Sequence, residues 1–289
     1  LHPLVILGAV LGILGFLFDP FSSHSVLYGT GKLILLFICT VFLIPFPVME
    51  DRAFNLFGLN APSWSLFWEY IANIFYAFIL CKINRRYLAV LAIVAAAALC
   101  FVSYRTGNLL GGWSKDNFWD GGARVSYSFL AGLLIYRFNW IIKNRLGFIG
   151  LAVLLSFAFT MPYFKWNWIA ETSVVLFYFP LLVSLGAGST LSTGSKPLCV
   201  FSGKISYPLY MTHYAAIWIF GNYFTSHKPS SFELSIVILS GTILLVGFAY
   251  LVMVFYDIPI RRYLTTKRQQ KIKITEKIKR DELSMIENH

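Results

Sequence analysis

Residues 62–80, PSWSLFWEYIANIFYAFIL, decide the fold: the run is apolar and long enough to enter a bilayer, yet it carries a carboxylate, Glu69, near its middle. If the run is helical, Ser65, Glu69, Asn73 and Tyr76 form a polar stripe on one face. Ionisable groups in membrane segments are costly and usually face a bundle interior, a cavity or a partner. Glu69 is therefore a candidate functional residue, although pairing with an arginine or protonation in a helix contact would also explain it.

The composition of the whole chain fits a membrane protein that crosses the bilayer several times. Hydrophobic residues make up 57% and charged residues 13% of the 289 residues, whereas ordinary soluble domains have about 45–50% and about 25%. The apolar runs are continuous and do not alternate, which predicts helices and excludes barrel strands. We therefore expect an all-α transmembrane bundle of eight or nine helices, from runs at about 3–18, 33–48, 64–81, 87–103, 121–138, 147–162, 169–186, 205–223 and 234–256.

The formal net charge of +11 comes from lysine and arginine in short connections, such as 82–86 and 137–145, and in the tail from residue 261. This is the positive-inside pattern, so we expect these segments and the 261–289 tail to be cytoplasmic. Nucleic-acid binding is excluded because no basic surface of a soluble fold is available. The four cysteines form no C-x-x-C pair and no histidine lies at metal-ligand spacing, so we expect no metal site.

A second polar stripe lies on SYPLYMTHYAAIW (206–218), where Ser206, Tyr210 and His213 recur at helical spacing. Histidine exchanges protons near neutral pH, so His213 is a candidate for proton transfer. A single histidine in a membrane helix also often serves as a hydrogen-bonded packing residue. The residues alone leave both interpretations open.

Arg124 is the candidate cation near a membrane edge, where a guanidinium offers a bidentate partner for carboxylate or phosphate. An anchor that snorkels to the headgroups is the commoner explanation for such an arginine. The chain holds no zinc signature, Walker loop, dinucleotide fingerprint or G-x-S-x-G elbow. The residues taken alone therefore predict a helical bundle with polar clusters and do not identify a reaction.

Four segments, in their order and spacing, resemble the membrane acyltransferase 3 family of bacterial O-acyltransferases. They are PSWSLFWEYIANIFYAFIL (62–80), GGARVSYSFLAGLLIYR (121–137), GKISYPLYMTHYAAI (203–217) and YDIPIRRYL (256–264). Trp64, Ser65 and Glu69 match the family's W-S-L-x-x-E pattern. Its I-S-Y-x-x-Y-x-x-H pattern matches Ser206, Tyr207, Pro208, Tyr210 and His213.

The resemblance implies a multi-pass inner-membrane enzyme that moves an acyl group, usually acetyl, from acyl-CoA to a hydroxyl of a surface polysaccharide or lipid-linked glycan. It departs from the family at the front, where two leading helices with an essential arginine and histidine would precede Leu1. We therefore expect an N-terminally truncated acyltransferase domain over 1–260, followed by the basic tail. His2 does not replace the missing histidine.

Under this interpretation Glu69 and His213 are the predicted catalytic residues. Glu69 would face a polar passage between donor and acceptor. The predicted substrate-binding residues are Trp64, Ser65, Trp68, Asn73, Arg124, Ser206 and Tyr210. The expected partners are acyl-CoA as donor substrate, a sugar hydroxyl as acceptor and the lipid bilayer, with no bound cofactor. The competing hypotheses are a transporter or flippase with a proton relay through Glu69 and His213, and a catalytically inactive truncated product.

Overall fold

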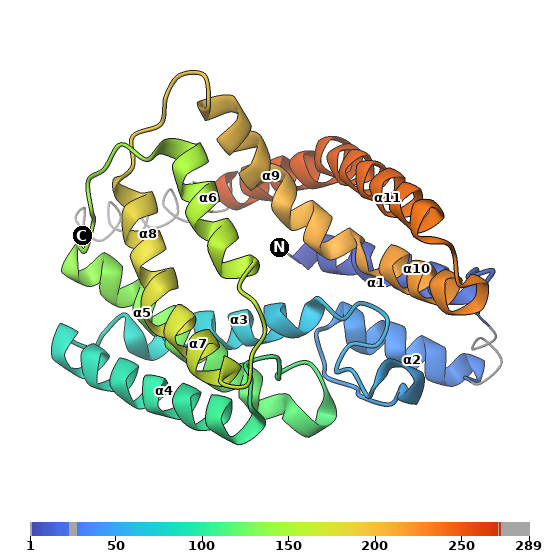
Figure 1. Ribbon diagram of the computed structural model, residues 1–289, viewed down its shortest axis with the longest axis horizontal. Helices are drawn as coiled ribbons and strands as arrows, with labels where there is room; N and C mark the ends of the chain where they lie inside the picture. Colours follow the sequence, from blue (N-terminus) through green and yellow to red (C-terminus); the bar gives the residue numbers. More distant parts are fainter. Residues whose placement is uncertain (1, 23–27, 271, 273–289) are drawn as a thin grey trace, which may run out of the picture.

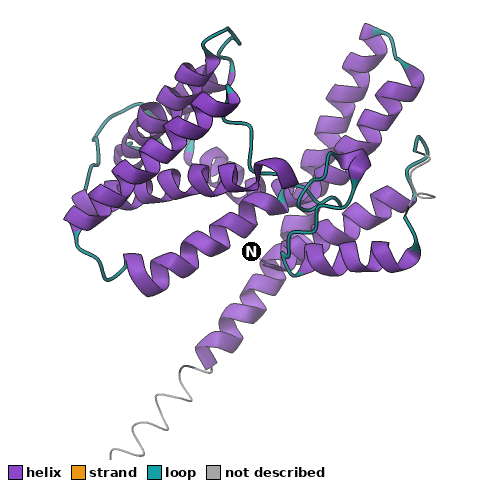
Figure 2. Cartoon of the chain, turned by 90° about the horizontal axis from the view of Figure 1, so that it is seen from below, coloured by secondary structure: helices purple, strands orange, loops and turns teal. Residues whose placement is uncertain are grey.

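The computed structural model describes residues 2–22, 28–270 and 272, and this part of the chain contains helices and no strand (Figures 1 and 2). The α-helices are α1 (His2–Leu17), α2 (Thr30–Val41), α3 (Ser63–Phe75), α4 (Arg85–Thr106), α5 (Phe118–Phe138), α6 (Gly147–Phe159), α7 (Asn167–Ser173), α8 (Phe179–Gly188), α9 (Lys196–Thr212), α10 (Tyr214–His227) and α11 (Ser231–Val252). The short helices are η2 (Glu50–Arg52), η3 (Tyr76–Leu80), η4 (Lys115–Asn117), η5 (Val174–Tyr178) and η6 (Met253–Asp257). The predicted all-α class is thus confirmed.

Three continuous helices in the described part of the chain are long and apolar enough to cross a bilayer: Arg85–Thr106, Asn167–Gly188 and Ser231–Gln270. The last two contain π-helical segments, and α1, α2 and α6 are shorter apolar helices. Large apolar side chains point outward along α4 and α11, including Ile93 and Leu244. Such surfaces are expected to face lipid, so this is a membrane protein. Eight or nine crossings remain a prediction.

Two predicted apolar runs differ from the helices. The run at 33–48 ends as helix α2 at Val41, and a loop containing Pro45 and Pro47 follows, because proline removes backbone donors. The run at 205–223 is two helices, and the first begins already at Lys196. The break falls at His213, whose ring nitrogen contacts the carbonyl of Tyr210. A side chain that takes a backbone acceptor in this way interrupts the helical ladder.

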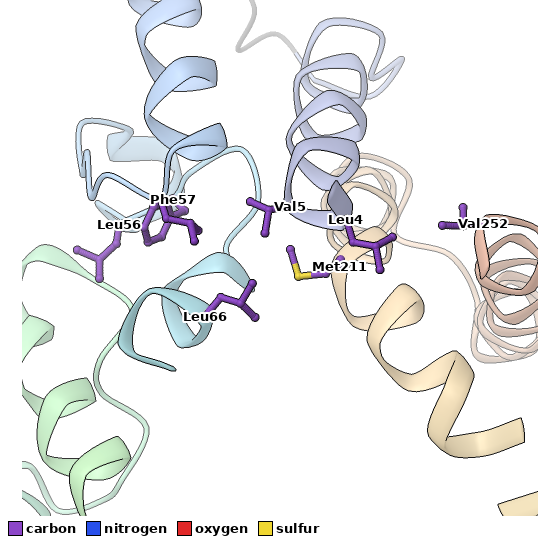
Figure 3. Packing of buried hydrophobic residues seen from close by; sticks show 8 residues of the cluster. Leu4, Val5, Leu56, Phe57, Leu66, Met211 and Val252 are labelled. Carbon is purple, nitrogen blue, oxygen red and sulfur yellow. The ribbon is translucent and has the colours of Figure 1, made fainter. Parts of the chain in front are cut away.

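The helices pack as two groups joined through α3 (Figure 1). In the first group α4 packs on α5 and α7, while α8 contacts α5 and α6. In the second group α1 contacts α2, α9 and α10, and α9 lies against α11. Helix α3 packs on α5 of the first group, and its Leu66 joins the buried cluster of the second (Figure 3).

That cluster fixes where the second group meets the loop before α3. Leu4 and Val5 of α1 pack with Leu56 and Phe57 of the loop and with Met211 of α9 (Figure 3). Close approach depends on Gly12, because an added Cβ would lie 2.0 Å from the carbonyl oxygen of Leu59. The loop is therefore packed between α1, the N-terminal end of α3 and the C-terminal end of α9.

The helix of α11 continues through η6 as far as Gln270, so it crosses the predicted boundary between residues 260 and 261 without a break. Arg261 pairs with Asp257 one turn earlier. Figure 2 shows this helix leaving the body of the molecule toward the grey C-terminal trace. The rest of the predicted tail, residues 271 and 273–289, lies outside the described residues.

Candidate functional site

The two sequence motifs meet where α3 begins and α9 ends. The hydroxyl oxygens of Ser65 and Tyr210 lie 2.7 Å apart. Both also lie within hydrogen-bond distance of the carbonyl oxygen of Pro62, at 3.0 Å and 3.2 Å. Each hydroxyl has one proton, so one donates to the carbonyl and the other can donate to its neighbour. Two predicted substrate-binding residues, 145 positions apart in the chain, are thereby joined.

Arg124 reaches the same junction from α5. Its Nη1 donates a hydrogen bond to the carbonyl oxygen of Gly111, and its guanidinium carbon lies 5.2 Å from the ring centre of Trp64. A guanidinium at this distance over an indole gains cation–π attraction. Arg124 and Trp64, both predicted for binding, are therefore fixed against one another beside the Ser65–Tyr210 pair.

A pocket of about 510 Å³ opens beside this junction. It lies where the start of α3, the start of α10 and the loops 45–62 and 107–117 come together. Its lining is rich in aromatic rings, with two neighbouring charged residues and an amide: Asp51, Arg52, Asn55, Trp64, Trp113, Tyr210, Tyr214 and Trp218. A concave site with aromatic walls and a few polar groups is typical of small-molecule binding.

Arg52 is the lining residue with the least usual environment. It is only 6% exposed, and its Nη1 donates to the carbonyl of Gly58 at 2.8 Å. Its guanidinium lies 4.5 Å from the ring centre of Trp218, 5.5 Å from that of Phe16 and 5.8 Å from that of Tyr214. Nε has no hydrogen-bond partner among the described residues. Arg52 is thus a buried cation enclosed mainly by aromatic rings.

Burial lowers the pKa of Arg52, with Tyr214 and Asp51 acting in the opposite direction. The ion pairs in the described part of the chain are Arg105–Asp120 and Arg261–Asp257, so Arg52 has no carboxylate in direct contact. Removing an ion from water costs several kcal/mol even after relaxation. Cation–π contacts recover about 0.5–2 kcal/mol each, but aromatic rings leave the Nε–H without a conventional acceptor. Sequence reasoning missed Arg52 because it lies in a connection with no motif.

A network of carboxylates positions the loop 107–117 that forms one wall of the pocket. Glu171 of α7 accepts a hydrogen bond from the backbone N–H of Leu109 at 2.6 Å and another from the side chain of Asn167. Asp120, buried at the start of α5, pairs with Arg105 at the end of α4. Glu171 was also missed, although an acidic residue within the apolar run 169–186 was a readable signal.

Trp68, predicted to bind substrate, lies buried between α3 and α5 and does not line the pocket. Its ring centre is 4.9 Å from that of Phe118 and 6.1 Å from that of Trp119. The backbone of Gly121 allows this approach, since an added Cβ would lie 2.6 Å from the indole nitrogen. In this structure Trp68 packs the two helices together.

Glu69 and Asn73 follow Ser65 down the same face of α3, as the spacing predicted, and both are exposed. The Asn73 amide donates to the backbone carbonyl of Glu69 at 2.8 Å. Asn73 also lines a separate cleft of about 440 Å³ between η3 and α5, together with Tyr76 and Ser128. No ion pair includes Glu69 among the residues described, so pairing with an arginine does not account for it.

His213 lies between α9 and α10, half-buried. Its Nδ1 is 3.1 Å from the carbonyl oxygen of Leu209 and 2.9 Å from that of Tyr210. Carbonyl oxygens only accept, so in the neutral ring Nδ1 carries the proton and Nε2 keeps the lone pair. Ser206, about two helical turns before His213, is exposed and donates to the carbonyl of Gly203 at 3.0 Å. In the neutral ring, Nε2 is therefore the nitrogen that can accept a proton.

No group of histidine, cysteine, aspartate and glutamate side chains suited to a metal ion occurs in the described ranges. A protein-family model described as an acyltransferase domain matches residues 2–255. Comparison with curated proteins and with solved structures gives no match. The family match includes all the residues that form the pocket and the Ser65–Tyr210 junction.

Proposed function

Because the chain belongs to the acyltransferase 3 family, we propose that it transfers an acyl group, acetyl in the first instance, from acyl-CoA to a hydroxyl of a surface polysaccharide or lipid-linked glycan. The net reaction forms an ester C–O bond and breaks the thioester C–S bond. The proton of the acceptor hydroxyl passes through a protein base and ends on the CoA thiol. No bound cofactor is needed for this chemistry.

The observation that carries the proposal is the aromatic pocket of about 510 Å³ beside the Ser65–Tyr210 junction. Indole rings such as those of Trp64 and Trp113 offer flat apolar faces on which the C–H faces of a sugar ring can stack. Asn55 and Asp51 offer acceptors for sugar hydroxyls. We therefore assign the pocket to the acceptor and not to the donor.

Two groups near the pocket are the proposed proton acceptors. Glu69 lies one helical turn beyond Ser65 on the same face of α3. His213 lies three residues beyond Tyr210, with Nε2 available in the neutral ring. A positioned carboxylate or imidazole that removes a proton in the transition state contributes about 10²–10⁴-fold to a rate.

We further propose a multi-pass arrangement in the inner membrane with the tail on the cytoplasmic side. The pocket adjoins the start of Ser63–Leu80, and the basic connection 82–86 follows its end. At 1.5 Å per residue the two are about 27 Å apart, close to the hydrocarbon thickness of about 30 Å. Basic connections prefer the cytoplasm, so the pocket would open on the opposite face, away from the cytoplasmic acyl-CoA.

The test is acyl transfer in liposomes that contain the purified protein, with labelled acetyl-CoA and a bacterial glycan acceptor. We expect Glu69→Gln to reduce transfer by about 100-fold or more, because it removes a proton acceptor and keeps the side-chain shape. Glu233→Gln is the matched control, since Glu233 is an exposed carboxylate that accepts from Tyr223 at the start of α11. Full transfer by Glu69→Gln would refute its role. Proton-coupled uptake without any need for acyl-CoA would refute the enzyme in favour of a transporter.

A further inference from the structure

The pocket contains more charge than binding of a neutral sugar requires. Arg52 lines it, is 94% removed from solvent by burial, and has an Nε–H without a partner in the described part of the chain. Buried cations are ordinarily paired with an anion or fully hydrogen-bonded. Arg52 meets neither condition, because no carboxylate of the described residues lies within ion-pair distance of it, although Asp51 and Asp19 act on its charge from farther away.

Neighbouring groups do not supply that acceptor. The carboxylate of Asp51 accepts a hydrogen bond from the hydroxyl of Tyr28 and forms no ion pair with Arg52. The guanidinium also lies against the rings of Trp218, Phe16 and Tyr214. The Tyr214 hydroxyl is a neutral hydrogen-bond partner, and Asp19 acts on the charge of Arg52 only from beyond ion-pair distance. These rings hold the guanidinium in place without providing an anion. The Nε–H itself is buried, but Arg52 lines the pocket, so an anion bound there would lie next to a cation that no carboxylate of the described residues pairs with.

The size and walls of the pocket indicate what carries the anion. A volume of about 510 Å³ is far larger than a phosphate ion needs, and three indole rings line it. Flat apolar walls fit a sugar ring, whereas a lone anion would require several polar donors. The occupant must therefore combine a sugar ring with a negative substituent.

We propose that the acceptor is an acidic sugar, whose carboxylate or phosphate substituent binds Arg52 while its ring stacks on the indole walls. Guanidinium groups bind both kinds of anion through paired N–H donors. This inference deepens the proposed function, and it rests on that function for the assignment of the pocket to the acceptor. Arg52 thus acts in specificity, and no proton transfer is assigned to it.

The experiment measures binding alone, by tryptophan fluorescence of the full chain in nanodiscs without acyl-CoA. The probes are galacturonate, galactose 6-phosphate, neutral galactose and inorganic phosphate. We expect both charged sugars to bind at least about tenfold more tightly than galactose, because a charge-assisted hydrogen bond is gained. Inorganic phosphate should bind more weakly than either charged sugar. Equal binding of charged and neutral sugars would overturn the inference, and so would inorganic phosphate binding as tightly as the charged sugars.

Variants connect the preference to Arg52. In Arg52→Gln the preference for charged sugars should fall below about threefold, whereas Lys115→Gln, which removes an exposed cation from the neighbouring loop, should keep it. Asp51→Asn leaves Arg52 in place and removes a negative charge from the pocket. It should therefore strengthen the binding of galacturonate and leave the binding of galactose unchanged. This variant tests the inference even if Arg52→Gln does not fold, and an unchanged preference would count against it.

The outcome also separates this inference from the proposed function. Protein that binds acidic sugars tightly and never transfers an acyl group would contradict the enzyme while leaving the binding specificity intact. Protein that acylates neutral glycans and shows no preference for charged sugars would contradict only the role of Arg52.

Discussion

Removing Arg105 should destabilise the protein far more than neutralising its partner Asp120. The side chain of Arg105 is 52% exposed and that of Asp120 only 3%. In Arg105→Ala the carboxylate stays buried without a cation, and its Oδ2 already has no hydrogen-bond partner among the described residues. In Asp120→Asn the arginine can simply rehydrate.

The expected size follows from the buried carboxylate. Breaking a buried pair by removing one partner costs about 3–5 kcal/mol. The cost has a ceiling, because protonating an ordinary aspartic acid takes about 4 kcal/mol at pH 7 and about 1.5 kcal/mol at pH 5. We therefore expect Arg105→Ala to lose about 3–4 kcal/mol at pH 7 and about 1.5 kcal/mol at pH 5. Asp120→Asn should lose about 1 kcal/mol, the value of one hydrogen bond.

The assay is equilibrium unfolding by SDS in bicelles, followed by tryptophan fluorescence at both pH values. Adding Asp120→Asn to Arg105→Ala should restore most of the lost stability, since the double variant buries no charge. If the double variant is less stable than Arg105→Ala, or if both single variants cost the same at pH 7, the reasoning from buried charge is wrong.

Two other predictions use the same unfolding assay. Gly12→Ala should lower the free energy of unfolding by about 1–3 kcal/mol, because its Cβ would overlap the backbone of the loop before α3. Gly247→Ala, where nothing lies within 4 Å of the added Cβ, should be neutral or slightly stabilising. Equal losses of stability in the two variants would contradict the close approach at Gly12. Ser65→Ala and Tyr210→Phe should each lower stability by about 0.6 kcal/mol, because in each single variant the remaining hydroxyl still donates to the carbonyl of Pro62. The double variant loses both hydrogen bonds and should cost about twice as much. A double variant as stable as one of the single variants would refute the shared hydrogen bonding.

The sequence predicted most of the helices because long apolar runs need helical hydrogen bonding within a bilayer. It also placed Ser65 and Tyr210 on polar stripes, which the structure joins. The bend at His213 was not predicted, since apolar periodicity alone does not reveal a side chain that takes a backbone carbonyl. For this reason, the prediction of a single helix over 205–223 was wrong.

Arg52 illustrates the limit of reading the site from sequence. Its environment comes from α1 and α10, which supply Phe16 and Trp218, and the latter is more than 160 positions away in the chain. No local pattern encodes such an arrangement. Trp68 and Ser206 were both predicted to bind substrate, whereas the structure places Trp68 in the packing of α3 against α5 and Ser206 on an exposed face of α9.

The unbroken helix Ser231–Gln270 has 40 residues, which at 1.5 Å per residue is about 60 Å. The hydrocarbon core of a bilayer is about 30 Å thick, so roughly half of this rod must extend beyond the lipid tails or lie strongly tilted. Its end near Lys267 and Arg268 is thus held at a set height and direction by a stiff arm, and not on a loose tether. Any molecule that binds those last turns would be kept at a constant distance from the membrane surface.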